Sequence, residues 1–397
     1  MGLKRVFISI FGVLLLGAVV YSCSEEMLVN DQDDPALKSA TLNDMELLGK
    51  MIFFDENISI NKNMSCATCH APEAGFVGPD SEINLFGAVY EGSVPDAFGD
   101  RRPPTAAYGG DSPVLYMDKG GLWVGGMFWD GRATGWRLGD PLAEQAQGPF
   151  LNPVEHGLDM ASDVIDIIKT SDYAGLFEQV WGDGALDGPA GKVYDMVGFA
   201  VAAYERSAEV NPFTSKYDYF LKGRARLTPE EQKGRTIFQG KGKCSKCHII
   251  KGKAPLFTDF TYDNLGIPRN TMNPYLIDHP DWVDPGLGGF LKSIGDQTWE
   301  DNLGKHKVPT LRNVDLRTPG LVKAYGHNGY FKSLEEIVHF YNTRDVPGEG
   351  WNGMPWPAPE VSENVNTAEL GNLKLTAQDE AALVAFMKTL SDGYMME

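Results

Sequence analysis

Four of the five cysteines stand in two copies of the pattern Cys-x-x-Cys-His. Two thiols at this spacing can add to the two vinyl groups of a haem, and the histidine that follows can then bind the iron. A four-cysteine zinc site would leave both histidines unused, and a redox dithiol would need neither the histidine nor a second copy. The sequence therefore predicts two covalently bound c-type haems. The attachment residues are Cys66, Cys69 and His70 in the first copy and Cys244, Cys247 and His248 in the second.

Similar segments surround the two haem-attachment sequences. A glycine followed four residues later by a phenylalanine precedes each copy, and apolar residues recur at helical spacing in residues 193–206 and 376–390. A helix before the haem that crosses a helix at the end of the domain is the class I cytochrome c arrangement. We therefore expect a mainly α fold of two class I cytochrome c-type domains, each with one covalent haem and long irregular loops. The pairs are Gly49 and Phe53 in the first copy and Gly234 and Phe238 in the second.

The N-terminus has the pattern of an export signal. Lys4 and Arg5 precede an apolar run that ends near Tyr21 and is shorter than the ~20 residues of a membrane span. Ser22 and Cys23 resemble a bacterial lipobox, in which the cysteine is acylated; the alternative is an ordinary signal peptide with an incidental cysteine. We expect a lipoprotein anchored to the membrane, in the periplasm or at the cell surface of a Gram-negative-type envelope.

These patterns divide the chain into five predicted parts. They are a lipoprotein signal peptide (1–22), an acidic tether (23–39), an N-terminal cytochrome c domain with the first haem (40–212), a polar linker (213–223) and a C-terminal cytochrome c domain with the second haem (224–397).

The charge of the chain limits its partners. The net charge is −19, and a nucleic-acid binder would show a basic stripe instead. An acidic surface repels acidic partners and can steer a basic redox protein toward the molecule. The sequence leaves the oligomeric state open, a dimer included.

Longer motifs resemble a known family, the bacterial diheme cytochrome c peroxidases, and in particular their methylamine-utilisation (MauG-like) branch. The resemblance covers nearly all of residues 44–395. It implies that the N-terminal haem reduces hydrogen peroxide and that the C-terminal haem passes electrons from a small redox protein or an oxidisable protein or organic substrate. The most specific strings are residues 128–133, residues 144–149 with Glu155, residues 308–314, and His327-Asn328-Gly329 with residues 333–336.

The resemblance also implies roles at the N-terminal haem. Glu155 matches the family's distal carboxylate, Gln145 the amide that fixes the bound oxygen species, and Pro149 a residue that shapes the pocket. Trp129 matches the tryptophan between the two haems. No histidine lies between His70 and residue 156, so this haem is expected to be open or water-ligated. His156 itself stays open as a ligand, a proton donor or a structural residue.

At the C-terminal haem, the resemblance places Tyr341 where the peroxidase branch has a methionine and the MauG-like branch a tyrosine. A phenolate would lower the reduction potential relative to methionine. The competing candidates for this sixth ligand are His339, which falls on another face if the segment is helical, and Met354.

The sequence departs from the family at two places. Arg102 stands where the family has an asparagine that helps to hold calcium, and extra residues 320–323 follow the segment 316–319 that supplies carbonyl ligands. These departures weaken the expectation of a calcium ion, and the cation at Arg102 could replace part of its charge. Residues 240–243 lack the surface tryptophan that the MauG-like branch uses as a relay to its protein substrate. The resemblance therefore does not imply that protein substrate for this chain.

Two function classes fit two haems. We predict a peroxidase-type oxidoreductase. The alternative is a non-enzymatic diheme electron carrier of the cell envelope, which would have two six-coordinate haems and no reaction with peroxide. Gln145, Pro149 and Glu155 argue against a carrier, because electron transfer alone needs none of them.

Overall fold

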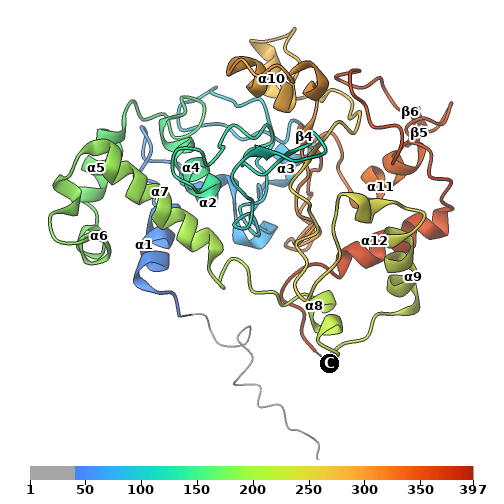
Figure 1. Ribbon diagram of the computed structural model, residues 1–397, viewed down its shortest axis with the longest axis horizontal. Coiled ribbons are helices and arrows are strands. Elements are labelled where there is room, and N and C mark those ends of the chain that lie inside the picture. The colour runs from blue at the N-terminus through green and yellow to red at the C-terminus, as the bar shows by residue number, and fades with distance from the viewer. Residues whose placement is uncertain (1–40, 397) are drawn as a thin grey trace, which may run out of the picture.

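The computed structural model describes residues 41–396 (Figure 1). The predicted signal peptide, the tether with Cys23, and Ala40 lie outside these residues. In the described part, no helix is both long and apolar enough to span a membrane.

Helices dominate the described chain, and strands occur only as three short antiparallel pairs. The α-helices are α1 Asp44–Phe53, α2 Cys66–Cys69, α3 Ser81–Leu85, α4 Pro141–Gln147, α5 Ala161–Lys169, α6 Ala174–Trp181, α7 Ala190–Arg206, α8 Lys216–Leu221, α9 Pro229–Gln239, α10 Gly286–Ser293, α11 Leu334–Thr343 and α12 Ala377–Lys388. The strand pairs are β1 Tyr116–Met117 with β2 Trp123–Val124, β3 Tyr262–Asp263 with β4 His306–Lys307, and β5 Gly350–Trp351 with β6 Met354–Pro355. The short 3₁₀ helices include η3 Pro149–Leu151 and η5 Cys244–Lys246.

The two halves repeat one helix crossing. In the first half α1 crosses α7, and in the second α9 crosses α12 (Figure 1). A Cβ atom added to Gly49 or Gly234 would lie 1.8 Å from the carbonyl oxygen of Ala200 or Ala382, respectively. Only glycine allows two helix backbones to approach so closely. The shared glycine thus fixes the same crossing in both halves, and the expected duplication is present in three dimensions.

Each crossing is surrounded by its own apolar core. The first core gathers Phe53, Phe150, Val197 and Tyr204, and the second gathers Phe238, Phe331, Phe340 and Phe386. A side-chain cap begins α9, because the Thr228 hydroxyl accepts from the backbone N–H of Glu231.

The segment predicted as a polar linker contains α8, which packs into the second core. Tyr217 is 1% exposed and contacts the rings of Phe257 and Phe386. Asp218 is buried too and pairs with Arg312. The chain between the halves is therefore held in place by the second half.

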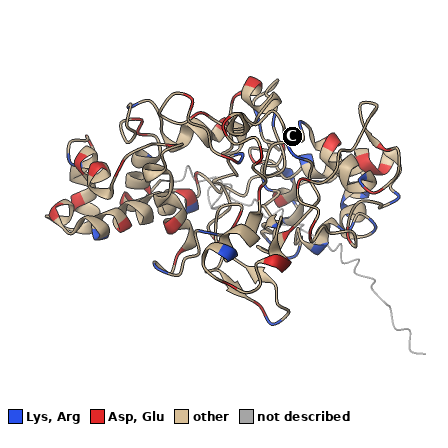
Figure 2. Ribbon diagram, turned by 90° about the horizontal axis from the view of Figure 1, so that it is seen from above, with Lys and Arg blue, Asp and Glu red and all other residues tan. Residues whose placement is uncertain are grey.

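The long loops of both halves meet in the middle of the molecule, between the two helix crossings (Figure 1). Acidic side chains, 54 in the chain against 35 basic ones, are distributed over both halves (Figure 2).

Candidate active site

The two Cys-x-x-Cys-His sequences form matching turns. The backbone N–H of His70 donates to the Cys66 carbonyl at 2.9 Å, and that of His248 donates to the Cys244 carbonyl at 2.9 Å. No disulfide joins any of the four cysteines in the described chain. Each turn therefore presents two thiols and an imidazole from one side of the backbone, as covalent haem attachment requires.

A backbone carbonyl orients each imidazole. Nδ1 of His70 lies 3.2 Å from the Phe76 carbonyl, and Nδ1 of His248 lies 2.8 Å from the Phe257 carbonyl. A proton on Nδ1 satisfies this contact and leaves the Nε2 lone pair for iron. Burial lowers the pKa of His70 to about 4 and also lowers the pKa of His248, which keeps both rings neutral.

A second repeated contact supports the loops that hold these carbonyls. The hydroxyl of Thr105 donates to the Gly75 carbonyl at 2.9 Å, and the hydroxyl of Thr310 donates to the Leu256 carbonyl at 2.6 Å. Both accepting residues directly precede the phenylalanine whose carbonyl faces the histidine. The two halves therefore position their axial histidines by the same device.

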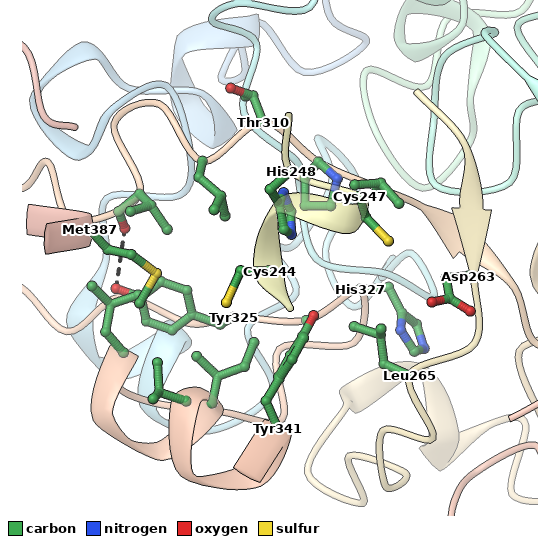
Figure 3. A pocket seen from close by; sticks show the side chains of 18 of the residues that line it. Cys244, Cys247, His248, Asp263, Leu265, Thr310, Tyr325, His327, Tyr341 and Met387 are labelled. Atoms are coloured by element: carbon green, nitrogen blue, oxygen red, sulfur yellow. Dashed lines mark hydrogen bonds between the residues drawn. The ribbon is translucent and has the colours of Figure 1, made fainter. Parts of the chain in front are cut away.

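A cavity in the second half collects the donors that a covalent haem needs (Figure 3). Cys244, Cys247 and His248 line one side, and Tyr341 projects toward them from α11. Most of the remaining wall is apolar: Phe238, Leu334, Val338, Leu370, Leu383 and Met387. Two thiols, an imidazole and a phenol in one apolar cavity fit a c-type haem, which the thiols would hold by thioether bonds and His248 by its iron.

The structure separates the three candidates for the sixth ligand. Tyr341 lines this cavity, whereas Nδ1 of His339, two residues earlier, lies 3.0 Å from a carboxylate oxygen of Glu380. Met354 is 71% exposed on β6. Of the three, Tyr341 is the one that lines the cavity together with Cys244, Cys247 and His248.

Near the first attachment sequence, a short folded segment presents Glu155. The segment follows α4, which carries Gln145, and begins with Pro149, whose carbonyl accepts from the backbone N–H of His156 at 3.2 Å. Burial raises the pKa of Glu155, and the opposing attraction of Arg132 is smaller. The charge of this carboxylate in turn raises the pKa of both Cys66 and Cys69, so it lies within electrostatic range of the first haem-attachment turn.

His156 is packed in the first core. Its ring is 3% exposed, Nδ1 lies 2.5 Å from the Ile58 carbonyl, and the ring meets Phe150 edge to face at 5.1 Å. These contacts account for the residue structurally.

Trp129 lies where the halves meet. Its indole N–H donates to the Arg102 carbonyl at 2.8 Å, and its own carbonyl accepts from the backbone N–H of Lys307 at 2.9 Å. The side chain also borders the cavity of the second half. The indole is thus fixed between the first half and the cavity that fits the second haem.

This arrangement is found in known proteins. Residues 43–226 match the family described as di-haem cytochrome c peroxidase. The methylamine utilization protein MauG of Paracoccus denitrificans (strain Pd 1222) is 36% identical over 364 residues, which cover 87% of this chain and 88% of that protein. The chain belongs to this family. The cytochrome c551 peroxidase of Nitrosomonas europaea is 29% identical to this diheme peroxidase over 82% of the present chain and 80% of its own length.

Solved structures agree. The diheme peroxidase BthA from Burkholderia thailandensis E264 is 30% identical, with a TM-score of 0.75 over 91% of this chain and 89% of that one. The protein is therefore a peroxidase-type oxidoreductase with two c-type haems on a mainly helical, two-cytochrome fold. The expected family, fold class, cofactors and enzyme class are confirmed, and the electron-carrier alternative is not supported.

The diheme peroxidase also has a buried polar cluster that we did not predict. Arg101 donates to both carboxylate oxygens of Asp284, at 2.7 and 2.6 Å, and to Asp130 at 2.6 Å. The rings of His306 and His327 stack at 3.5 Å, and Nε2 of His306 lies 3.0 Å from Asp284. Asp130 and His327 belong to the family strings. In the sequence, the only sign of this cluster was that both residues lie in the family strings, because the two are far apart along the chain.

A further buried acid lies near the first haem-attachment turn. Glu205 on α7 is 5% exposed, Oε2 has no hydrogen-bond partner in the described chain, and burial raises the pKa of the carboxyl to about 8. Between its unfolded and folded pKa values, the folded state binds more protons than the unfolded state. Stability must therefore fall as the pH rises through this range.

We expect the peroxidase to lose on the order of 3 kcal/mol of stability from this group between pH 5 and pH 8. Glu205→Gln should remove this part of the pH dependence and be more stable than the wild type at pH 8. Denaturant unfolding at both pH values measures it. The exposed, matched change Glu73→Gln should leave the pH dependence unaltered, and an unchanged pH profile in Glu205→Gln would contradict the assignment.

Proposed function

We propose that this protein reduces hydrogen peroxide at the haem held by His70, with Glu155 as the proton-transferring group. The observation that supports this proposal is a partly buried carboxylate with a raised pKa near the first attachment turn. When bound, the haem supplies the iron that takes up peroxide and the electrons that reduce it. The cleavage also needs one proton moved from the near oxygen to the far oxygen, which a positioned carboxyl group can do.

We further propose that Gln145 and Pro149 help to bind and orient the substrate. Gln145 is partly buried on α4, and the structure shows no hydrogen bond from its side chain to any described residue. Its amide is therefore free to bind an oxygen species. Pro149 begins the 3₁₀ turn η3, whose carbonyl contacts fix the segment that carries Glu155.

Electrons would reach this site through Trp129 from the C-terminal haem, with Tyr341 as its sixth ligand. The position of the Trp129 indole between the halves supports this electron path. The position of Tyr341 opposite the attachment residues supports its role as the ligand. A Tyr341 phenolate would donate negative charge to the iron and would stabilise its oxidised states. This favours storage of oxidising equivalents over a high reduction potential.

Tyr341→Met should raise the reduction potential of the C-terminal haem by on the order of 0.1 V or more, within the ~0.8 V range that axial ligands span. Spectroelectrochemical titration measures this potential. His339→Met places the same side chain two residues away and should leave the potential near its wild-type value. If only His339→Met shifted the potential, or neither variant did, Tyr341 would not be the ligand.

The electron source is proposed to be a small basic redox protein or an oxidisable substrate. The net charge of −19 supports the first through electrostatic steering. Relatives are named for methylamine utilization and for cytochrome c551. We do not propose methylamine utilization for this chain, because residues 240–243 lack the surface tryptophan of the MauG-like branch. We further propose a periplasmic or cell-surface location with a lipid at Cys23.

One experiment tests the proposed function directly. The as-isolated diferric protein is examined by optical and electron paramagnetic resonance spectroscopy, before and after one equivalent of hydrogen peroxide, without reductant. We expect a high-spin signal from an open N-terminal haem that disappears with peroxide. Two low-spin haems that react only after half reduction would indicate a hidden distal ligand, and two that never react would overturn the proposal.

A further inference from the structure

Two cations lie where the halves meet, Lys323 buried and Arg102 partly buried. Lys323 belongs to the extra residues of the second half and is 4% exposed, while Arg102 comes from the first half. Burial lowers the pKa of Lys323, and the positive charge of Arg102 lowers it further. Within residues 41–396, neither side chain has a carboxylate at ion-pair distance. Unpaired buried cations are costly and need an explanation.

The amine of Lys323 is held by backbone oxygens. Nζ donates to the Asn313 carbonyl at 2.7 Å and to the Leu316 carbonyl at 2.9 Å. It also lies against the first half, because a Cβ added to Gly75 would be 3.2 Å from Nζ. Gly75 precedes Phe76, whose carbonyl faces Nδ1 of His70. The amine thus supports the loop that orients the axial histidine of the first haem.

Arg102 reaches across the interface in the opposite direction. Its Nε donates to the Gly326 carbonyl at 2.9 Å, and its backbone N–H donates to the His327 carbonyl at 2.9 Å. The same residue accepts the indole N–H of Trp129 on its carbonyl. Together, Lys323 and Arg102 therefore bind four backbone carbonyls of the second half, those of residues 313, 316, 326 and 327.

A calcium ion does not fit this arrangement. Calcium requires about six to eight oxygen ligands at roughly 2.3–2.6 Å, many of them carboxylates. Here Lys323 occupies two carbonyl oxygens, a guanidinium stands where the family has an amide oxygen, and two positive groups would repel a divalent cation. The groups gathered here suit a cationic hydrogen-bond donor and not a metal ion.

We propose that Lys323, assisted by Arg102, replaces the interdomain calcium ion of the family, so that the two haem domains are joined by a cation built into the chain. Burial lowers the pKa of Lys323 to about 7, yet the amine donates hydrogen bonds to both carbonyls whether or not it is protonated. A covalently attached donor cannot dissociate, so the interface is independent of the calcium concentration.

The wild-type holoprotein provides the first test. After treatment with the calcium chelator EGTA and desalting, metal analysis should find less than stoichiometric calcium. The unfolding temperature and the electron paramagnetic resonance signals of both haems should equal those measured in millimolar calcium chloride. One tightly held calcium per chain, or a fall in unfolding temperature on chelation, would overturn the proposal.

Variants test the amine itself. Lys323→Met should lower the unfolding temperature by about 5 °C or more, because two buried carbonyls lose their donor, and should alter the signal of the His70 haem. Lys192→Met, an exposed lysine on α7, is the matched control and should do neither. A Lys323→Met protein indistinguishable from this control overturns the proposal.

The double variant Arg102→Asn/Lys323→Ala restores an amide oxygen and frees both carbonyls. We expect it to be destabilised in EGTA and to regain unfolding temperature in millimolar calcium chloride, whereas magnesium chloride at equal ionic strength has no such effect. The absence of a calcium response would overturn the assignment of this place as the cation position, and the wild-type measurement remains decisive if the variant does not fold.

Discussion

Glu155→Gln is expected to slow the reaction of the diferric protein with hydrogen peroxide by about 10²–10⁴-fold, the usual contribution of one positioned acid–base group. Glutamine keeps the size and shape of the side chain but can neither accept nor return a proton. Because Glu155 binds no iron in this proposal, the resting spectra of both haems should stay as in the wild type. Stopped-flow absorbance after mixing with peroxide measures the rate.

The pH dependence of the reaction rate distinguishes a catalytic role of Glu155 from a structural one. Burial raises the pKa of Glu155 above its usual range, so the wild-type rate should change across an ionisation at higher pH than a free carboxyl would show. This ionisation should be absent in Glu155→Gln. The control is Glu73→Gln, an exposed carboxylate three residues after His70 that carries the same charge change. A wild-type rate in Glu155→Gln, or an equal loss in the control, would exclude the role.

Local chemistry made much of the site predictable. The Cys-x-x-Cys-His spacing determines a single turn, so both turns form as expected with the same 2.9 Å backbone hydrogen bond. The glycine and phenylalanine before each turn lie one helical turn apart, and the structure uses Gly49 and Gly234 for the close helix crossings. These features depend on neighbours within a few residues, where sequence and structure are directly linked.

Features that depend on distant partners were not predictable from a single sequence. The segment 213–223 joins the two predicted domains and is interpreted as a linker, but Tyr217 and Asp218 contact partners in distant parts of the chain. In the sequence, Lys323 is only one residue of an insertion. The structure shows that its amine donates to the carbonyls of Asn313 and Leu316. The stacking of His306 on His327 likewise follows from tertiary contacts alone.

Arg312→Met is expected to destabilise the protein by about 3–5 kcal/mol, because it leaves a buried carboxylate without its partner. The guanidinium donates to both oxygens of Asp218, at 2.9 and 2.8 Å, and the two side chains are 1% and 2% exposed. It also lies over the rings of Tyr108 and Phe213, at 4.9 and 4.3 Å from their centroids. One residue of the second half therefore anchors both α8 and a loop of the first half.

Guanidinium chloride unfolding of the holoprotein, followed by far-ultraviolet circular dichroism, measures this loss. Arg206→Met is the matched control: Arg206 makes the same two-pronged contact with Asp140 at 2.8 and 2.7 Å, but its side chain is 36% exposed. Since water screens that pair, the control should lose about 1 kcal/mol or less. If the two losses were equal, burial would not be what makes the Arg312 pair matter.

A substitution of Asp218 distinguishes the stability lost to an unpaired charge from the stability lost to poorer packing. Asp218→Asn added to Arg312→Met removes the stranded carboxylate, so the double variant should be more stable than Arg312→Met alone. The amide oxygen of the introduced asparagine can still accept from the backbone N–H of Ser215 at the start of α8, as the Asp218 carboxylate does. If the double variant were no more stable, the loss would come from the aromatic contacts of Arg312 with Tyr108 and Phe213, and the interface between the halves would depend on packing, not on charge.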